Sequence, residues 1–135
     1  MSASANKQML QHIFDELSIG NSRPLIDSMA DDFSWTVMGT NKWSGAYEGK
    51  QAVLNELLAP LRSQLEGQYT SAHRFIAEND LVVVECEGHA VTKTGKPYNN
   101  KYCFVIRVVD GKLRELTEYA DTELVAAALG PREIN

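Results

Sequence analysis

Four β-rich runs with short connections fill the second half of this 135-residue chain, and they constrain its fold more than any other feature. The runs cover residues 69–76, 81–92, 99–109 and 113–119. Turn residues separate them at Glu78-Asn79-Asp80, Thr94-Gly95-Lys96-Pro97 and Asp110-Gly111. Connections this short join antiparallel neighbours, because a parallel pair needs a crossover of about a dozen residues or more. The second half is therefore predicted to be a meander of long hairpins.

The first half of the chain is predicted to be mostly helical. Over about 5–19, apolar residues recur every three or four positions, at Leu10, Ile13, Phe14 and Leu17. Pro24 suits the first turn of a short second helix, and the alternation of apolar and polar residues over 33–39 predicts a half-buried strand. Two helices are thus expected before the first strand.

Between these halves, a loop is predicted over 41–49 and a helix over 50–65, where leucines recur at helical spacing. Pro60 removes a backbone donor and is expected to kink or split this helix, with Gly67 as its C-cap. Asp121 or Thr122 is expected to cap a last helix running to Leu129. This order predicts an α+β fold, in which helices cover one face of a curved sheet and leave a cone for a small ligand.

Composition narrows the classes of partner. The 13 Lys and Arg residues against 18 Asp and Glu give a net charge of −5, so the basic face that nucleic acid requires is missing. No apolar run approaches the roughly 20 residues that span a bilayer, and the N-terminal segment lacks the apolar core of a signal peptide. We therefore expect one domain over residues 1–135 in a cytoplasmic protein, with no nucleic acid and no membrane as partner.

Cofactor and metal motifs are absent from the sequence. His12, His73 and His89 show no metal-binding spacing, and neither a dinucleotide-binding glycine motif nor a phosphate-binding loop occurs. Cys86 and Cys103 lie in apolar stretches without a Cys-x-x-Cys spacing, which is typical of buried free thiols. We expect no metal and no cofactor.

Three local strings carry a family resemblance. They are Ala30-Asp31-Asp32-Phe33-Ser34-Trp35, Tyr47-Glu48-Gly49-Lys50, and Asp110-Gly111-Lys112-Leu113 leading to Glu118-Tyr119-Ala120-Asp121. With the order of elements, they resemble the SnoaL-like proteins of the nuclear transport factor two superfamily, which includes ketosteroid isomerase, polyketide cyclases, scytalone dehydratase and limonene epoxide hydrolase. The resemblance implies a cystatin-like α+β roll, a strongly curved mixed or antiparallel sheet wrapped around N-terminal helices. It also implies a homodimer through the outer sheet face.

The resemblance does not extend to the catalytic residues of the family's known enzymes. The last catalytic Asp of limonene epoxide hydrolase falls on Glu118, but its Arg and other Asp fall on Cys86 and Gly88, and its Tyr and Asn on Trp35 and Val37. The base of ketosteroid isomerase falls at about Val37, which cannot accept a proton. Epoxide hydrolysis by the family mechanism is therefore not expected.

Glu118 is the candidate catalytic residue. A carboxylate inside an apolar cone loses hydration, which raises its pKa and makes it a usable acid or base. Leu116 has the parity of an inward Glu118 but Leu113 has the opposite parity, so a bulge between them is needed if both leucines are buried. The alternative is that Glu118 lies on the outer face in a solvated cross-strand pair.

Candidate ligand-binding residues share the inward parity of their strands. Asn100 and Tyr102 have the same strand parity as Phe104, so their side chains are expected to face the cavity. They could polarise a ligand oxygen, or they could instead satisfy backbone groups near the strand end. The remaining wall is expected to consist of Trp35, Val37, Cys86, Gly88, Ala90 and Phe104. On the outer face, a turn at Gly95-Lys96 would pair Ala90 with Tyr102 and place Glu85 opposite Arg107.

Two functions remain open on the sequence alone. The first is a cofactor-independent isomerase, cyclase or dehydratase acting on a small hydrophobic molecule that is cyclic or bears a carbonyl group. The second is a ligand-binding or dimeric scaffold protein of the same fold without catalysis.

Overall fold

The computed structural model describes residues 2–132. Its helices are α1 (Ala3–Leu17), α2 (Arg23–Asp27), α3 (Lys50–Ala52), the π-helical segment η1 (Val53–Leu58), α4 (Ala59–Gln64) and α5 (Thr122–Ala128). Its strands are β1 (Met29–Val37), β2 (Gly45–Glu48), β3 (Leu65–Glu78), β4 (Leu81–Thr92), β5 (Lys101–Val109) and β6 (Lys112–Ala120).

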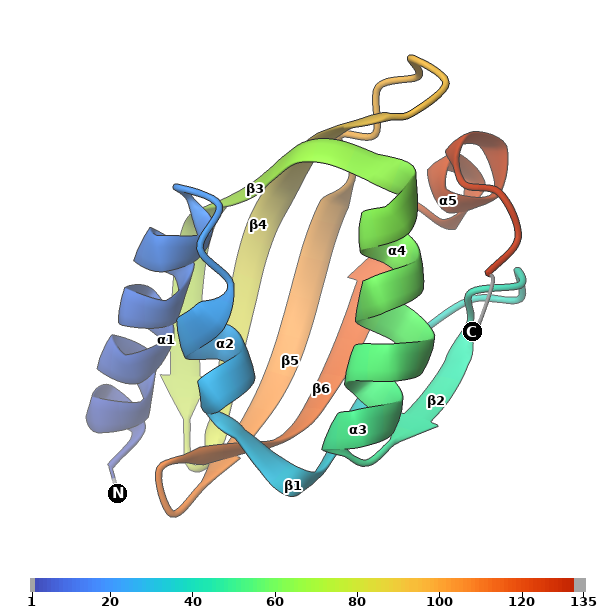
Figure 1. Cartoon of the computed structure of the whole chain (residues 1–135). Helices are drawn as coiled ribbons and strands as arrows, with labels where there is room; N and C mark the ends of the chain where they lie inside the picture. Colours follow the sequence, from blue (N-terminus) through green and yellow to red (C-terminus); the bar gives the residue numbers. More distant parts are fainter. Residues whose placement is uncertain (1, 133–135) are drawn as a thin grey trace.

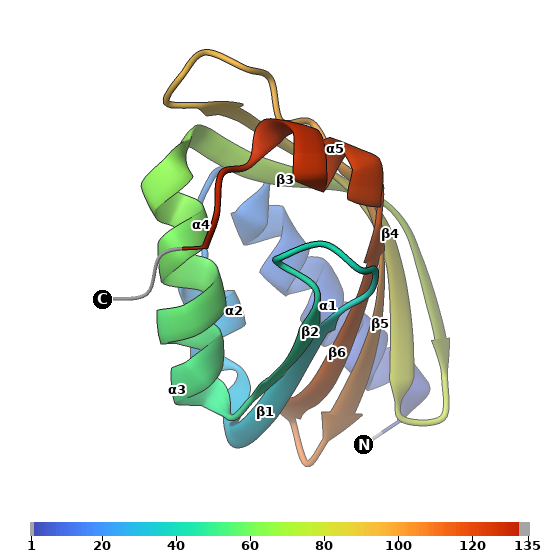
Figure 2. The same cartoon turned by 90° about the vertical axis from the view of Figure 1, so that its right-hand side faces the viewer.

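The six strands form one curved sheet in the order β2-β1-β6-β5-β4-β3. Strands β3 to β6 are antiparallel neighbours, as the short turns predict. β1 runs parallel to β6, so the sheet is mixed. Figure 1 shows α1, α2 and the continuous helix from α3 to α4 on the concave side, and Figure 2 shows α5 across one end. The predicted α+β cone is confirmed.

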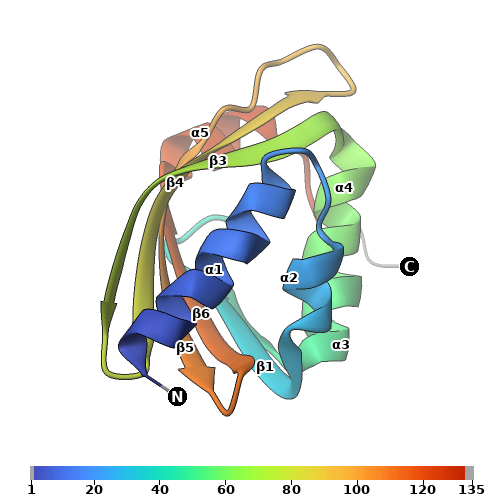
Figure 3. The same cartoon turned by 90° about the vertical axis from the view of Figure 1, so that its left-hand side faces the viewer.

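Helix α1 packs against β3 on the concave side (Figure 3). Ser2 caps its N-terminus by accepting a hydrogen bond from the Ala5 N–H at 3.1 Å. Phe14, 3% exposed, meets Phe75 of β3 edge to face at 5.8 Å and Phe104 of β5 at 6.2 Å. The apolar side of α1 thus covers one part of the concave face of the sheet and leaves the neighbouring part uncovered.

The helix over 50–64 is distorted around Pro60 rather than sharply broken. Proline has no N–H to donate, and just before it the turns widen into η1, where the Ala59 N–H bonds the Leu54 carbonyl. The helix then ends at Gln64, and β3 begins at Leu65. The expectation that Gly67 caps the helix is wrong, because Gly67 lies inside β3 with φ +64° at an irregularity of the β3–β4 pairing.

Two further expectations need correction. The segment over 41–49 contains a strand as well as a loop, because β2 pairs antiparallel with β1. The β4–β5 hairpin pairs Cys86, not Ala90, with Tyr102, because its turn is centred on Thr94. Thr92 Oγ1 fixes that turn by accepting from the Lys96 N–H at 2.9 Å.

The observed register also changes which residues form salt bridges on the outer face. Glu85 lies opposite Cys103 on β5, and its salt bridge is with Arg74 of β3 instead of Arg107. Arg107 bonds both carboxylate oxygens of Asp80 at 2.7 Å. Because the shift is an even number of residues, every side chain stays on the face that parity predicts. The homodimer through this face remains a prediction.

A bulge in β6 sets which side chains face the cone. Arg107 pairs with Glu115 and Val108 with Leu113, so Arg114 is an extra residue with no partner on β5. Leu113 and Leu116 are therefore both buried, at 0% and 2% exposed. Beyond the bulge, Glu118 lies opposite Phe104 and beside Val37.

Candidate functional site

A cavity of about 330 Å³ lies between the concave face of the sheet and the helices, within the range of small-molecule sites. Leu57, Leu58 and Leu61 form its helical wall, which Leu65 continues at the start of β3. Trp35, Val37, Phe104 and Leu116 form its floor on the sheet. Val125 and Leu129 line it from the C-terminal side, so the segment that includes α5 closes one end. The lining is predominantly apolar.

Hydrogen bonds fix the closing segment in place. Trp43, 4% exposed, donates from Nε1 to the Gly130 carbonyl at 3.0 Å, and Tyr47 donates from its hydroxyl to the Trp43 carbonyl at 2.7 Å. Gln64 Oε1 accepts from the Gly130 N–H at 2.8 Å. Trp43 is thus part of the cavity wall, a position that its loop location in the sequence leaves undecided.

Glu118 is the only Asp or Glu on the wall of this cavity within residues 2–132. Trp35 donates from Nε1 to Glu118 Oε1 at 3.1 Å. Burial among apolar side chains raises the pKa of Glu118 from 4.5 to about 7, because the charged form loses hydration, and the hydrogen bond from Trp35 opposes this rise. Near neutral pH the carboxylic acid and the carboxylate are therefore both populated.

A second polar cluster centres on Tyr98, which is 5% exposed and lines the cavity. Asn100 donates from Nδ2 to the Tyr98 hydroxyl oxygen at 3.2 Å. Burial raises the pKa of Tyr98 and of Tyr102. The Tyr98 hydroxyl accepts from Asn100 and keeps its own proton to donate.

The structure brings only part of the expected wall to the cavity. Five of the expected residues line it, namely Trp35, Val37, Tyr102, Phe104 and Glu118. Four do not, namely Cys86, Gly88, Ala90 and Asn100.

At Gly88 the reason is that a side chain of β5 covers the strand. The Tyr102 and Phe104 rings stack at 5.1 Å, and a side chain added at Gly88 would meet Tyr102 Cε2 at 3.0 Å. Burial raises the pKa of the Cys86 thiol, so this thiol stays protonated. Cys103 is half-buried on the outer face, where the sequence predicts a buried thiol.

Asn100 has a structural role instead of facing the cavity. Its Oδ1 accepts from the Asp121 N–H at 3.0 Å, and its Nδ2 donates to the Asp121 carbonyl at 3.2 Å. Asp121 in turn caps α5, accepting from the Leu124 N–H at 3.1 Å. Asn100 thereby joins Tyr98 to the start of the closing helix.

Sequence reasoning missed Tyr98 and Arg62 as lining residues. Tyr98 lies in an irregular segment with no periodicity to show its direction. Arg62, by contrast, follows Leu58 and Leu61 on one side of the helix, so the spacing of the leucines contained a usable signal.

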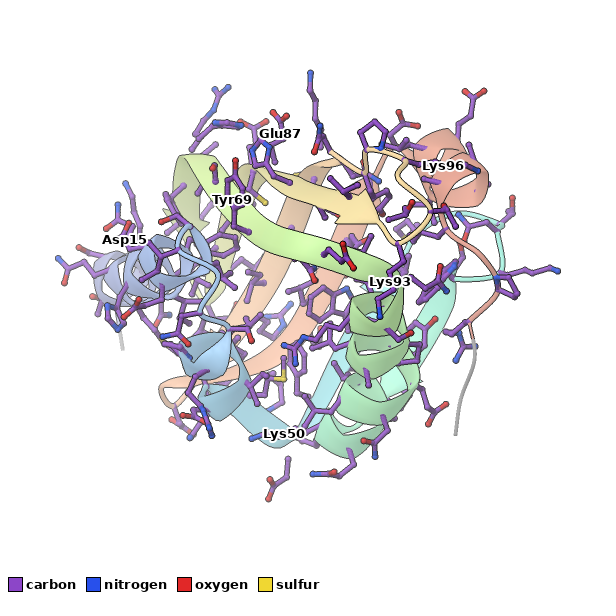
Figure 4. All side chains as sticks on the ribbon, turned by 45° about the horizontal axis from the view of Figure 1, so that its top comes forward. Asp15, Lys50, Tyr69, Glu87, Lys93 and Lys96 are labelled. Atoms are coloured by element: carbon purple, nitrogen blue, oxygen red, sulfur yellow. The ribbon has the colours of Figure 1, made fainter. Side chains whose placement is uncertain are left out.

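None of His12, His73 and His89 lines the cavity. His12 is exposed on α1, His73 lies 3.9 Å from Glu87 on the outer face, and His89 stacks on Tyr69 at 4.6 Å. Figure 4 shows Tyr69 and Glu87 on this part of the sheet. Within residues 2–132, no group of three or more His, Cys, Asp or Glu side chains could hold a metal ion. Every helix in the same range is too short or too polar to cross a membrane.

Comparisons with known proteins agree with this fold. The SnoaL-like domain family matches residues 10–116. No curated protein matches the chain. An NTF2-like protein from Burkholderia xenovorans LB400 is similar in structure, with 25% identity, a TM-score of 0.74, and coverage of 96% of this chain and 99% of that one.

Two further solved structures share the fold at lower identity. A putative SnoaL-like polyketide cyclase from Jannaschia sp. CCS1 has 17% identity and a TM-score of 0.74, covering 96% of this chain and 95% of that one. TerC, co-crystallised with polyporic acid, has 21% identity and a TM-score of 0.73, covering 87% of this chain and 92% of that one.

Proposed function

The chain belongs to the SnoaL-like domain family, and we propose that it binds a small hydrophobic molecule in the cavity and catalyses a cofactor-independent proton transfer on it. The reaction type is that of an isomerase, cyclase or dehydratase. The substrate is a compact cyclic compound with a carbonyl group. The polyketide cyclase description of one structural neighbour and the polyporic acid bound to another support a ligand of this size and chemistry.

The observation that carries the proposal is the state of Glu118. Its pKa of about 7 places both protonation states within reach at neutral pH, and a general acid or base works best under that condition. The apolar wall that raises this pKa also excludes water from the reacting atoms. The Trp35 indole orients the carboxyl group from one side and leaves the other oxygen for substrate.

Tyr98 supplies the second part of the mechanism. The Glu118 carboxylate removes a proton from the carbon next to the carbonyl, and the electron pair of that C–H bond moves onto the carbonyl oxygen as an enolate. The free proton of Tyr98 bonds this oxygen, while Asn100 holds Tyr98 by donating to it. Glu118 then returns its proton to another atom of the substrate, so the reaction needs no external oxidant or reductant. Tyr98 thus takes the role for which the sequence proposes Asn100 and Tyr102.

The proposal is tested with 2-tetralone, a flat cyclic ketone with acidic protons next to its carbonyl. Exchange of these protons in D₂O, followed by proton NMR, reports proton abstraction directly. We expect the protein to accelerate exchange with an apparent pKa near 7, and Glu118→Gln to remove about 100-fold or more of that acceleration. Tyr98→Phe is expected to remove about 10- to 100-fold.

Glu115→Gln is the matched control, because it is the same change three residues away on the outer face. It is expected to leave exchange unchanged. Exchange that is equal in the wild type and Glu118→Gln would contradict the catalytic role. If 2-tetralone also binds with equal affinity to both, the alternative of a ligand-binding protein without catalysis is the correct one.

A further inference from the structure

The mouth of the cavity differs in chemistry from its interior. The interior is apolar apart from Glu118 and the tyrosine cluster, whereas the rim carries Gly20, Ser22, Arg62, Gln68, Tyr69 and Thr70. These residues come from the α1–α2 connection, from α4 and from the start of β3. Of the Lys and Arg residues within 2–132, only Arg62 lines the cavity.

Arg62 is directed to the cavity by the helix on which it lies. It shares the cavity-facing side of the helix with Leu58 and Leu61, since Leu61 and Arg62 follow Leu58 by three and four residues. Its Nη2 donates to Ser22 Oγ at 2.8 Å, a contact that links the end of α4 to the opposite side of the mouth. The guanidinium group is therefore held at the rim by a neutral hydroxyl.

Arg62 has no acidic partner within residues 2–132, unlike the arginines that form salt bridges on the sheet. Arg74 pairs with Glu85, Arg107 with Asp80 and Glu115, and Arg114 with Asp32, all on the outer surface. The chain has net charge −5 and 18 acidic residues, yet within residues 2–132 the arginine at the cavity donates only to Ser22 and has most of its donors free. Planar guanidinium donors match the geometry of an oxyanion such as a carboxylate.

We propose that Arg62 and Ser22 form a recognition site for an oxyanion, so that the substrate is a flat apolar molecule with an anionic group at the end remote from the reacting carbon. This inference rests on the cavity being the ligand site of the proposed function. The anionic group lies at the rim on Arg62, and the ring system extends inward over Trp35 and Phe104 toward Glu118.

The arrangement of charge gives the ligand one orientation. Arg62 is exposed on α4, whereas Glu118 lies on β6 beside Val37 and opposite Phe104, so the two side chains line different parts of the cavity. An anion at the inner end would face the Glu118 carboxylate and lose its hydration among apolar side chains. The same anion at the rim meets an unpaired cation and keeps contact with water.

Two fluorescent probes that differ in one group test the site. 1-Anilinonaphthalene-8-sulfonate carries an oxyanion on a flat aromatic body, and N-phenyl-1-naphthylamine is the same body without it. We expect the wild type to bind the sulfonate at least about tenfold more tightly than the neutral probe, as a hydrogen bond to a charged group predicts. Arg62→Met is expected to abolish this preference and to leave the Kd of the neutral probe within about twofold.

Arg23→Met is the matched control, since Arg23 is a neighbouring exposed arginine outside the cavity lining. It is expected to bind both probes as the wild type does. Equal weakening of both probes in Arg62→Met would mean that Arg62 only supports the structure, and an unchanged preference would mean that the sulfonate binds elsewhere. Either result overturns the inference while leaving the proposed function in place. Failure of the neutral probe to bind the wild-type cavity would instead count against the proposed function itself.

Discussion

The two faces of the sheet give the same residue type, glutamate, opposite environments. Glu115 and Glu118 are three residues apart on β6, and the bulge at Arg114 precedes both. Glu115 lies on the convex face, 54% exposed, where Arg107 is its partner at 3.6 Å. Glu118 lies on the concave face, with the Trp35 indole as its only hydrogen-bond donor within residues 2–132 and a pKa of about 7.

The comparison shows that the position of the carboxyl group relative to solvent, and not its residue type, decides what it can do. On the convex face, the carboxyl group of Glu115 is exposed to water and is confined to weak surface pairing with an arginine. On the concave face, the loss of hydration is only partly offset by one neutral donor, so the acid holds its proton up to neutral pH. Each prediction below tests one aspect of this difference.

The largest expected difference lies in packing. Ile106 faces the cone and is fully buried, and Val105 beside it on β5 faces outward and is half-buried. Ile106→Ala is expected to lower the free energy of unfolding by about 2–5 kcal/mol, because it leaves a cavity in the core. Val105→Ala is expected to lower it by about 1 kcal/mol or less. Urea denaturation measures both, and equal losses would contradict the comparison. A loss for Val105→Ala that depends on protein concentration would support the expected homodimer.

The next largest effect concerns the pH dependence of stability. The folded state raises the pKa of Glu118 from 4.5 to about 7, so it binds more protons than the unfolded state between these values, and stability falls as pH rises through this window. The loss amounts to about 3 kcal/mol at most. Glu118→Gln removes this loss and is expected to be more stable than the wild type at pH 8.5, with little difference at pH 4. Thermal unfolding at both pH values measures these differences in stability. Glu115→Gln is the control and is expected to keep the pH dependence of the wild type.

A smaller effect is expected from the single donor to Glu118. Trp35→Phe keeps most of the aromatic wall but removes the hydrogen bond that stabilises the carboxylate. The pKa of Glu118 is expected to rise further, moving the pH profile of 2-tetralone exchange toward alkaline pH by about one to two units. Trp43→Phe is the control, because its indole bonds the Gly130 carbonyl instead. A profile that stays in place in Trp35→Phe would show that this hydrogen bond does not set the pKa.

The smallest effect is expected from the charged pairs of the convex face. Arg74 and Glu85 form a salt bridge with side chains 67% and 45% exposed. Glu85→Gln is expected to lower the free energy of unfolding by about 1 kcal/mol or less, and the difference should shrink further in 1 M NaCl. Urea denaturation at low and high salt measures it. A loss as large as that of Ile106→Ala would contradict the expectation that exposure to water keeps the salt bridges of this face weak.

The sequence predicts much of the fold because the elements are locally encoded. The alternation and turns of the second half give the bounds of β4 as the structure has them, and the two leucines on β6 require the observed bulge. β2 is not predicted because it has only four residues, and so short a strand shows almost no alternation of apolar and polar residues. The β4–β5 register was wrong because the Thr92 side chain, and not the Gly95-Lys96 pair, determines the centre of the turn.

The site is harder to predict, because its limits depend on how side chains cover one another. Strand parity places Tyr102 and Gly88 on the same face, but it cannot show that the Tyr102 ring covers Gly88 and keeps that position from the cavity. Tyr98 reaches the site from an irregular segment, held by a hydrogen bond from Asn100. Such contacts arise only once the segments pack together.

The central claim is that Glu118 exchanges its proton near neutral pH, and the chain carries its own reporters of that event. It has two tryptophans, so a ¹⁵N-labelled sample gives two indole N–H signals to follow by NMR from pH 4 to pH 9. The Trp35 signal is expected to shift with a midpoint near pH 7, because its partner is the Glu118 carboxyl group. The Trp43 signal, bonded to a backbone carbonyl, is expected to stay in place. A Trp35 midpoint near 4.5, or a shift that persists in Glu118→Gln, would contradict the account.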